Sequence, residues 1–136
     1  MSERASLGWP QVKRGISSVS GPTLLPHAIP WNQAMGYLMR GKFIPAAECF
    51  KLGIANEVTL HEELLPAAKR WAAEIMENAP LAVHAIKEAA RRGQEIPFDK
   101  RAYLARDVAD RVLLSEDSRE GIQAFKEKRK PVWKAR

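Results

Sequence analysis

The sequence predicts a mostly α-helical chain with one or two short strands, and three observations favour this fold class. Apolar residues recur with the 3.6-residue period of a helix beyond Thr59. Glycine, proline and serine concentrate in residues 1–31, which leaves little room there for long regular elements. Only short stretches, such as residues 9–12 and 54–58, have the composition of a strand.

Composition excludes several classes of protein. The chain has 136 residues, 46% of them hydrophobic, which is typical of a folded domain and not of a disordered segment. No apolar run approaches the roughly 18–20 residues that span a membrane, and no apolar secretory segment follows Met1. The lone Cys49 cannot form an internal disulfide, so we expect a reducing compartment and a cytoplasmic protein without membrane association.

The first 58 residues are expected to hold a few short elements. After an extended piece at residues 9–12, a short helix opens near Pro22 or Thr23, where the first helical turn tolerates proline. A second helix is expected from Trp31 to Met39, with Gly41 just past its end. A two-turn helix then begins at Pro45 and stops at Gly53, and residues 54–58 follow as a short strand without a pairing partner.

Four amphipathic helices are expected after that. Thr59 and Glu62 fit a capping box before an apolar pattern that extends to Met76. A second helix restarts at Asn78 and Pro80, runs to about Arg92 and buries Val83, Ile86 and Ala90. A third is marked by apolar residues from Phe98 to Leu113. Ser115, or the pair Asp117 and Glu120, caps a fourth that Pro131 stops. Such helices need a surface to pack on, which favours an oligomer or the back half of a longer fold.

Residue types alone indicate no catalytic centre. His27, His61 and His84 stand in unrelated contexts, and Cys49 lies between apolar neighbours, which favours a small buried residue over a nucleophile. No metal, nucleophile-elbow, dinucleotide or phosphate-loop motif is present.

The order of several weak motifs is more informative. Residues 7–16 read LGWPQVKRGI, residues 34–48 read AMGYLMRGKFIPAAE, and residues 52–58 read LGIANEV. Residues 78–83 read NAPLAV, and residues 115–131 read SEDSREGIQAFKEKRKP. In this order the segments resemble the enoyl-CoA hydratase/isomerase (crotonase) superfamily over about residues 7–133.

The resemblance implies a fold and its domains. It implies an α/β crotonase-like spiral, of which residues 1–59 would be the distal part of the core. Residues 60–136 would be the C-terminal helical oligomerisation region. By the same alignment, most of the sheet, both oxyanion-hole N–H groups and one catalytic glutamate belong upstream of Leu7. We therefore expect a homo-oligomer, a trimer or hexamer, and expect Met1 to be either the true start or an internal position of a longer protein.

The resemblance also assigns a catalytic position. The family's second glutamate aligns with Gln11, directly after Pro10, which the same resemblance makes a substrate-binding position. An amide can hold a water molecule but cannot titrate as a base. Ser18, Val19 and Pro22 also depart from the family pattern. The resemblance implies a lyase or an isomerase, and the amide at position 11 counts against hydration of an enoyl thioester through two carboxylates.

Two residues of the last helix align with family contacts to the nucleotide end of coenzyme A. They are Phe125, whose ring can stack on adenine, and Lys128, whose ammonium can pair with phosphate. A second aromatic, expected one helix earlier, falls on Ala109 and is missing. The resemblance implies an acyl-CoA substrate and no separate cofactor or metal.

Three classes of function remain. The ordered motifs favour an enzyme of acyl-CoA metabolism, whereas Gln11 and the absent oxyanion donors favour a non-catalytic module for CoA binding or trimer assembly. The net charge of +6 is the only feature that suggests nucleic-acid binding. Most of that charge lies in the basic tail, residues 126–136, with few aromatic residues among the cations, so no nucleic-acid partner is expected.

Overall fold

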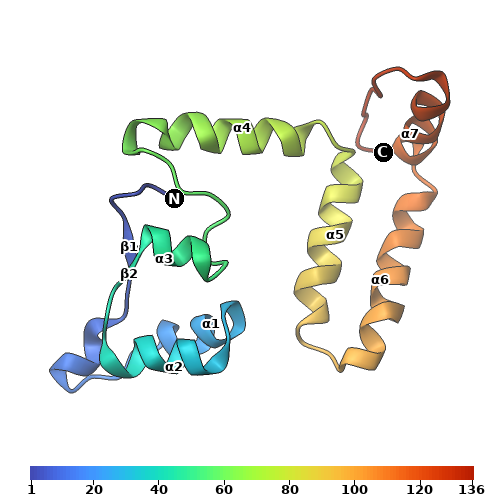
Figure 1. The fold of residues 1–136 in the computed structure, drawn as a ribbon. Coiled ribbons are helices and arrows are strands. Elements are labelled where there is room, and N and C mark those ends of the chain that lie inside the picture. Colours follow the sequence, from blue (N-terminus) through green and yellow to red (C-terminus); the bar gives the residue numbers. More distant parts are fainter. The chain divides into compact units, whose positions relative to one another are not determined.

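The computed structural model describes residues 1–136 as two compact units, Met1–Lys69 and Arg70–Arg136. The boundary between them falls inside helix α4, Leu64–Met76 (Figure 1). The chain is mostly helical with two short strands, as the sequence pattern predicts. No helix combines the length and the apolar character needed to cross a membrane.

The first unit is built around a minimal two-stranded sheet. Strand β1, Ser6–Leu7, pairs antiparallel with β2, Ile44–Pro45, so that Leu7 faces Ile44 across the ladder. Proline lacks the N–H of a ladder donor, and β2 tolerates Pro45 because the strand has a neighbour on one side only. The sequence did not predict this pairing, because two residues are too few to show an alternating pattern.

Three helices and two 3₁₀ turns complete the first unit. They are η1 (Pro10–Arg14), α1 (Ser20–Ala28), α2 (Trp31–Arg40), α3 (Ala46–Lys51) and η2 (His61–Glu63). The apolar faces of α1, α2 and α3 meet strand β2 in one buried cluster, which consists of Leu25, Ile29, Ala34, Ile44 and Cys49. Cys49 is the small buried residue that its apolar neighbours predict: its Sγ–H donates to the Ile44 carbonyl, and burial raises the pKa of the thiol.

Three expectations for the first unit are wrong. Residues 9–12 are not extended, because Pro10 has the φ of a first helical residue and starts η1. Residues 54–58 form no strand; the only pairing there is an isolated parallel bridge between Ser2 and Thr59. The Thr59–Glu62 capping box is absent, because Thr59 N and O bond Met1 O and Glu3 N and the turn begins later, at His61.

The second unit holds the C-terminal helices. Helices α5 (Pro80–Gly93) and α6 (Phe98–Leu113) pack side by side as a hairpin, and α7 (Glu116–Glu127) follows (Figure 1). The predicted helix limits at Pro80, Gly93, Phe98 and Ser115 are confirmed within a residue or two. Ser115 itself caps α7, because its Oγ accepts the Ser118 amide at 3.0 Å.

Few large apolar side chains are buried in the second unit. Val108 and Ala124 are buried, whereas Ile86, expected to be buried, is 72% exposed, and Phe98 is 84% exposed. The helices therefore leave an apolar surface uncovered within this chain.

Candidate functional site

Pro10 and Gln11 lie together on the η1 turn of the first unit. The turn ends at Gly15, which has φ +69° and donates to the Val12 carbonyl, and the Ile16 amide donates to the Gln11 carbonyl. The side chain of Gln11 is half-buried, and its Oε1 is buried without a hydrogen-bond partner. A buried amide oxygen of this kind offers an acceptor to a donor on a bound molecule, but it cannot remove a proton.

An apolar cavity of about 360 Å³ adjoins this turn. Its walls come from η1, the loop after it, α1 and α2, and consist of Trp9, Val12, Gly15, Ile16, Ser17, Ser18, Pro22, Met35, Leu38 and Met39. Trp9 is fixed there by a hydrogen bond from its Nε1 to Ser20 Oγ at 3.0 Å. Gly21 allows this packing, since a Cβ at Gly21 would lie 2.7 Å from Leu38 Cδ2. The cavity has the size and lining of a site for a short apolar group.

Phe125 and Lys128 lie together at the C-terminal end of α7. The Phe125 ring is 86% exposed, so no core contact accounts for it. Lys128 is exposed and has no ion-pair partner. The same is true of Lys126 and Lys130. An exposed ring one turn before free ammonium groups can meet a planar base and an anion at the same time.

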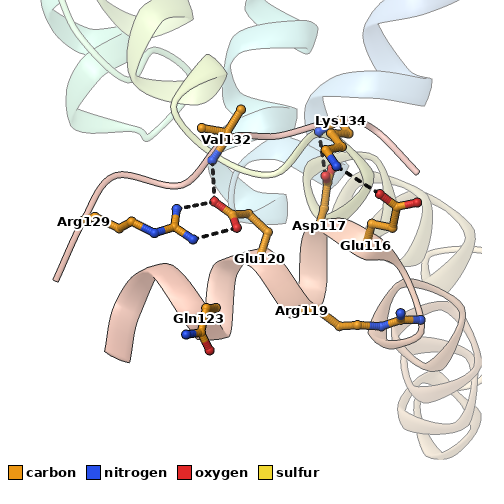
Figure 2. Close-up of a pocket in the computed structure, with 8 residues that line it drawn as sticks. All are labelled: Glu116, Asp117, Arg119, Glu120, Gln123, Arg129, Val132 and Lys134. Atoms are coloured by element: carbon orange, nitrogen blue, oxygen red, sulfur yellow. Dashed lines mark hydrogen bonds and ion pairs between the residues drawn. The ribbon is translucent and has the colours of Figure 1, made fainter. Parts of the chain in front are cut away.

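The other tail cations are paired, which the sequence reading missed. Arg129 forms a two-pronged ion pair with Glu120, at 2.5 Å and 2.9 Å, and a further contact with Glu127 at 2.5 Å. Hydrogen bonds from Arg129 and from the Val132 amide lower the pKa of Glu120 to about 2. Figure 2 shows this fork beside a cavity of about 650 Å³ that acidic residues of α7 and the tail line together.

Asp117 holds the rest of the tail. Its carboxylate is 1% exposed and accepts the Lys134 amide at 2.7 Å (Figure 2). It also accepts the Ala135 amide at 2.9 Å. The Arg136 carbonyl accepts the amides of Glu116 and Asp117. The acids at positions 117 and 120 thus bind the returning chain. Their three-residue spacing was visible in the sequence, but it looked like ordinary acidic enrichment of a first helical turn.

The structure assembles no other catalytic group. No cluster of His, Cys, Asp and Glu side chains has the arrangement of a metal site. His84 lies exposed on α5 and His27 on α1. Ser2 Oγ lies 3.2 Å from His61 Nδ1, yet no carboxylate bonds that ring and no described cavity contains the pair. A hydrolytic triad is therefore not supported.

Comparison with solved structures defines the class of fold. An enoyl-CoA hydratase from Mycobacterium tuberculosis H37Rv matches with a TM-score of 0.94 and 32% identity, over 99% of this chain and 54% of that one. An enoyl-CoA hydratase from Bacillus anthracis matches with a TM-score of 0.94 and 32% identity, over 99% of this chain and 53% of that one. The fold is crotonase-like.

The family follows from the sequence comparisons. The enoyl-CoA hydratase/isomerase family matches residues 1–136. Carnitinyl-CoA dehydratases of Salmonella typhi and Salmonella agona are 39% identical over 140 residues, which cover 99% of this chain and 54% of those proteins. The chain belongs to the enoyl-CoA hydratase/isomerase family, and it spans about half the length of the curated relatives it matches.

Proposed function

We propose that the protein acts in acyl-CoA metabolism and that its chain contributes to chemistry at a CoA thioester. The family match over residues 1–136 carries this proposal. In such chemistry two preorganised N–H donors stabilise an enolate-like state, and carboxylates move protons at the neighbouring carbons. The resemblance assigns the oxyanion donors upstream of Leu7, so the 136 residues described here are expected to bind acyl-CoA without turning it over.

The apolar cavity beside η1 is our candidate for the acyl group. Its volume of about 360 Å³ suits a short chain, and Pro10 and Gln11 lie on the turn beside it. Gln11 does not itself line the cavity, and its buried, unpartnered Oε1 is a free acceptor on the same turn as Val12, which does. We assign Pro10 to substrate binding and Gln11 to the acid position of the family.

Phe125 and Lys128 are our candidates for the nucleotide end of CoA. The exposed ring supports stacking on adenine, and the unpaired ammonium supports contact with phosphate. We further propose that these contacts reach a neighbouring copy of the chain in a trimer or hexamer. The exposed apolar side chains of α4–α7 support such self-association. A monodisperse monomer in sedimentation at micromolar concentration would contradict it.

The neutral side chain of Gln11 limits the reactions that the site can catalyse. With one carboxylate in place of two, a single proton relay remains, which suits isomerisation or hydrolysis of an acyl-CoA. Efficient hydration needs a second group to activate water. In a version of the chain completed by an upstream half that supplies the oxyanion donors and one carboxylate, Gln11→Glu is expected to raise crotonyl-CoA hydration on the order of 10²-fold, the lower range of general acid–base effects.

The matched control is Gln33→Glu, which makes the same change at an exposed position of α2. That variant should leave hydration unchanged. Equal hydration rates for the Gln11→Glu variant and the parent, with folding intact, would refute the acid-position assignment.

A non-catalytic CoA-binding or trimer-assembly module is the second candidate, and the neutral side chain at position 11 favours it. One assay of the completed version separates the two candidates. A module binds crotonyl-CoA in a titration but shows no turnover of enoyl, isomeric or hydrolysable thioesters, whether position 11 is Gln or Glu.

A further inference from the structure

Helix α7 ends in a left-handed residue that is not glycine. Lys128 has φ +54°, and the Lys128 and Arg129 amides donate back to the Phe125 and Ala124 carbonyls. Helix α2 ends with the same pair of bonds, from Gly41 and Lys42 to Leu38 and Tyr37, but there the left-handed residue is Gly41, at φ +56°. Both ends are Schellman motifs, in which glycine avoids the steric cost that a Cβ incurs.

Arg129, the residue after Lys128, makes side-chain ion pairs in addition to the backbone hydrogen bond of the helix end. The Arg129 guanidinium bonds both oxygens of Glu120 and one oxygen of Glu127. Glu120 also accepts the Val132 amide at 2.8 Å, so it ties the chain on the far side of Lys128 as well. A planar two-pronged pair fixes direction as well as distance, which a lysine at position 129 would not do.

The side chain of Lys128 itself is left free. Its neighbours on the tail, Arg129 and Lys134, are paired with acids of α7, whereas Lys128 is exposed and unpaired one turn beyond the exposed Phe125 ring. A strained backbone conformation that the surroundings hold in place is a common feature of functional sites.

We propose that Glu120 and Arg129 are positioning residues: their ion pair holds Lys128 in the left-handed conformation, which aims its ammonium at a phosphate of the CoA nucleotide beside Phe125. This inference rests on the proposed CoA contact of Lys128 and adds the device that orients it. On this account, position 128 is a lysine, although glycine would adopt the left-handed conformation without strain, because the site uses the ammonium group.

The test is a double-mutant cycle on CoA affinity, measured by calorimetric titration of the chain with CoA. Lys128→Met is expected to weaken binding about 10-fold, the size of one charge-assisted hydrogen bond. Arg129→Met is expected to weaken it roughly 3-fold to 5-fold in the parent chain and hardly at all in a chain that already carries Lys128→Met. Arg106→Met, at an exposed position of α6, is the charge-matched control and should change affinity less than about 2-fold.

Two further variants separate positioning from folding. Lys128→Gly should weaken CoA binding like Lys128→Met yet raise the melting temperature, by roughly 2 °C, because it relieves the strain. Glu120→Gln should lower CoA affinity and shift the NMR coupling that reports φ of residue 128, with the α7 amide signals otherwise retained.

The outcomes distinguish the two proposals. Additive effects of Arg129→Met and Lys128→Met would overturn the positioning role and leave the CoA contact standing, as would an unchanged φ at residue 128 in the Glu120→Gln variant. If the chain does not bind CoA, or Lys128→Met binds it as the parent does, both the contact and its positioning are overturned.

Discussion

The two units of the chain are stabilised in different ways. The first unit, Met1–Lys69, encloses a buried apolar cluster in which Leu25, Ala34 and Cys49 are at most 2% exposed. The second unit, Arg70–Arg136, buries a carboxylate, Asp117, and fastens its tail with hydrogen bonds and ion pairs, while Phe98 and Phe125 are exposed. The stability of the first unit can be tested by removing apolar volume from its core. The stability of the second unit can be tested by removing one hydrogen-bond acceptor.

The largest effect is expected in the apolar cluster. Leu25→Ala removes a side chain that is 2% exposed and should lower the free energy of unfolding of the first unit by about 2–4 kcal/mol. Leu24→Ala changes the neighbouring residue of α1, which is 60% exposed, and serves as control with an effect below about 0.5 kcal/mol. Amide hydrogen exchange resolves the two units. A similar loss of protection in both variants would contradict the importance of the cluster.

A smaller effect is expected from the buried carboxylate. Asp117→Ala leaves the Lys134 and Ala135 amides without their acceptor and should destabilise the second unit by about 1–3 kcal/mol. Faster exchange of the amides of residues 132–136 should accompany it. Asp110→Ala, at an exposed position of α6 without a hydrogen bond or ion pair, is the control. Protection of the tail that survives Asp117→Ala would show that other contacts hold it.

The same glycine substitution should act differently in the two units. Gly36→Ala in α2 adds a Cβ that meets nothing within 4 Å, so it should stabilise the first unit by about 0.5–1 kcal/mol. In α7, a Cβ at Gly121 would lie 3.3 Å from the Trp133 ring, whose Nε1 donates to the Glu77 carbonyl. Gly121→Ala should therefore gain less or lose stability. Thermal unfolding of the two variants gives the comparison, and equal gains would show that the Trp133 packing is loose.

The smallest effect concerns pH. Because the pKa of Glu120 is lowered to about 2, its ion pair stabilises the second unit above the ordinary glutamate pKa of about 4.3. That contribution falls as the pH drops from about 4.5 toward 2, where the folded carboxylate also takes up its proton. Glu120→Gln should remove this part of the acid sensitivity. Unfolding of parent and variant by urea at pH 6 and pH 3 measures it, and parallel losses in both would assign the acid sensitivity to other groups.

The same contrast explains how much of the fold was predictable from sequence. The helices from Leu64 onward were predicted because their apolar period and caps are local signals, as were Gly41 and Ser115 at helix ends. The β1–β2 pair and the Ser2–Thr59 bridge were not, because they join residues far apart in the sequence through short segments without a period. Asp117, Glu120 and Arg129 look like ordinary surface charges until the tail returns along α7.

The candidate site also combines features that the sequence indicates with features that only the structure shows. Gln11, Pro10, Phe125 and Lys128 came from a family resemblance, and the structure adds what sequence cannot contain. It adds a cavity beside Gln11, an unpaired amide oxygen, and a left-handed backbone at Lys128. Each depends on packing between elements and not on residue type.

The most direct test of where the chain binds the nucleotide is an NMR titration of the ¹⁵N-labelled chain with adenosine 3′,5′-bisphosphate. This compound is the nucleotide end of CoA without its thioester arm. We expect saturable shifts of the amides of residues 124–130, at the end of α7, and none at η1 or along α1 and α2. Shifts confined to the first unit, or no shifts up to millimolar ligand, would contradict the assignment of the nucleotide to Phe125 and Lys128.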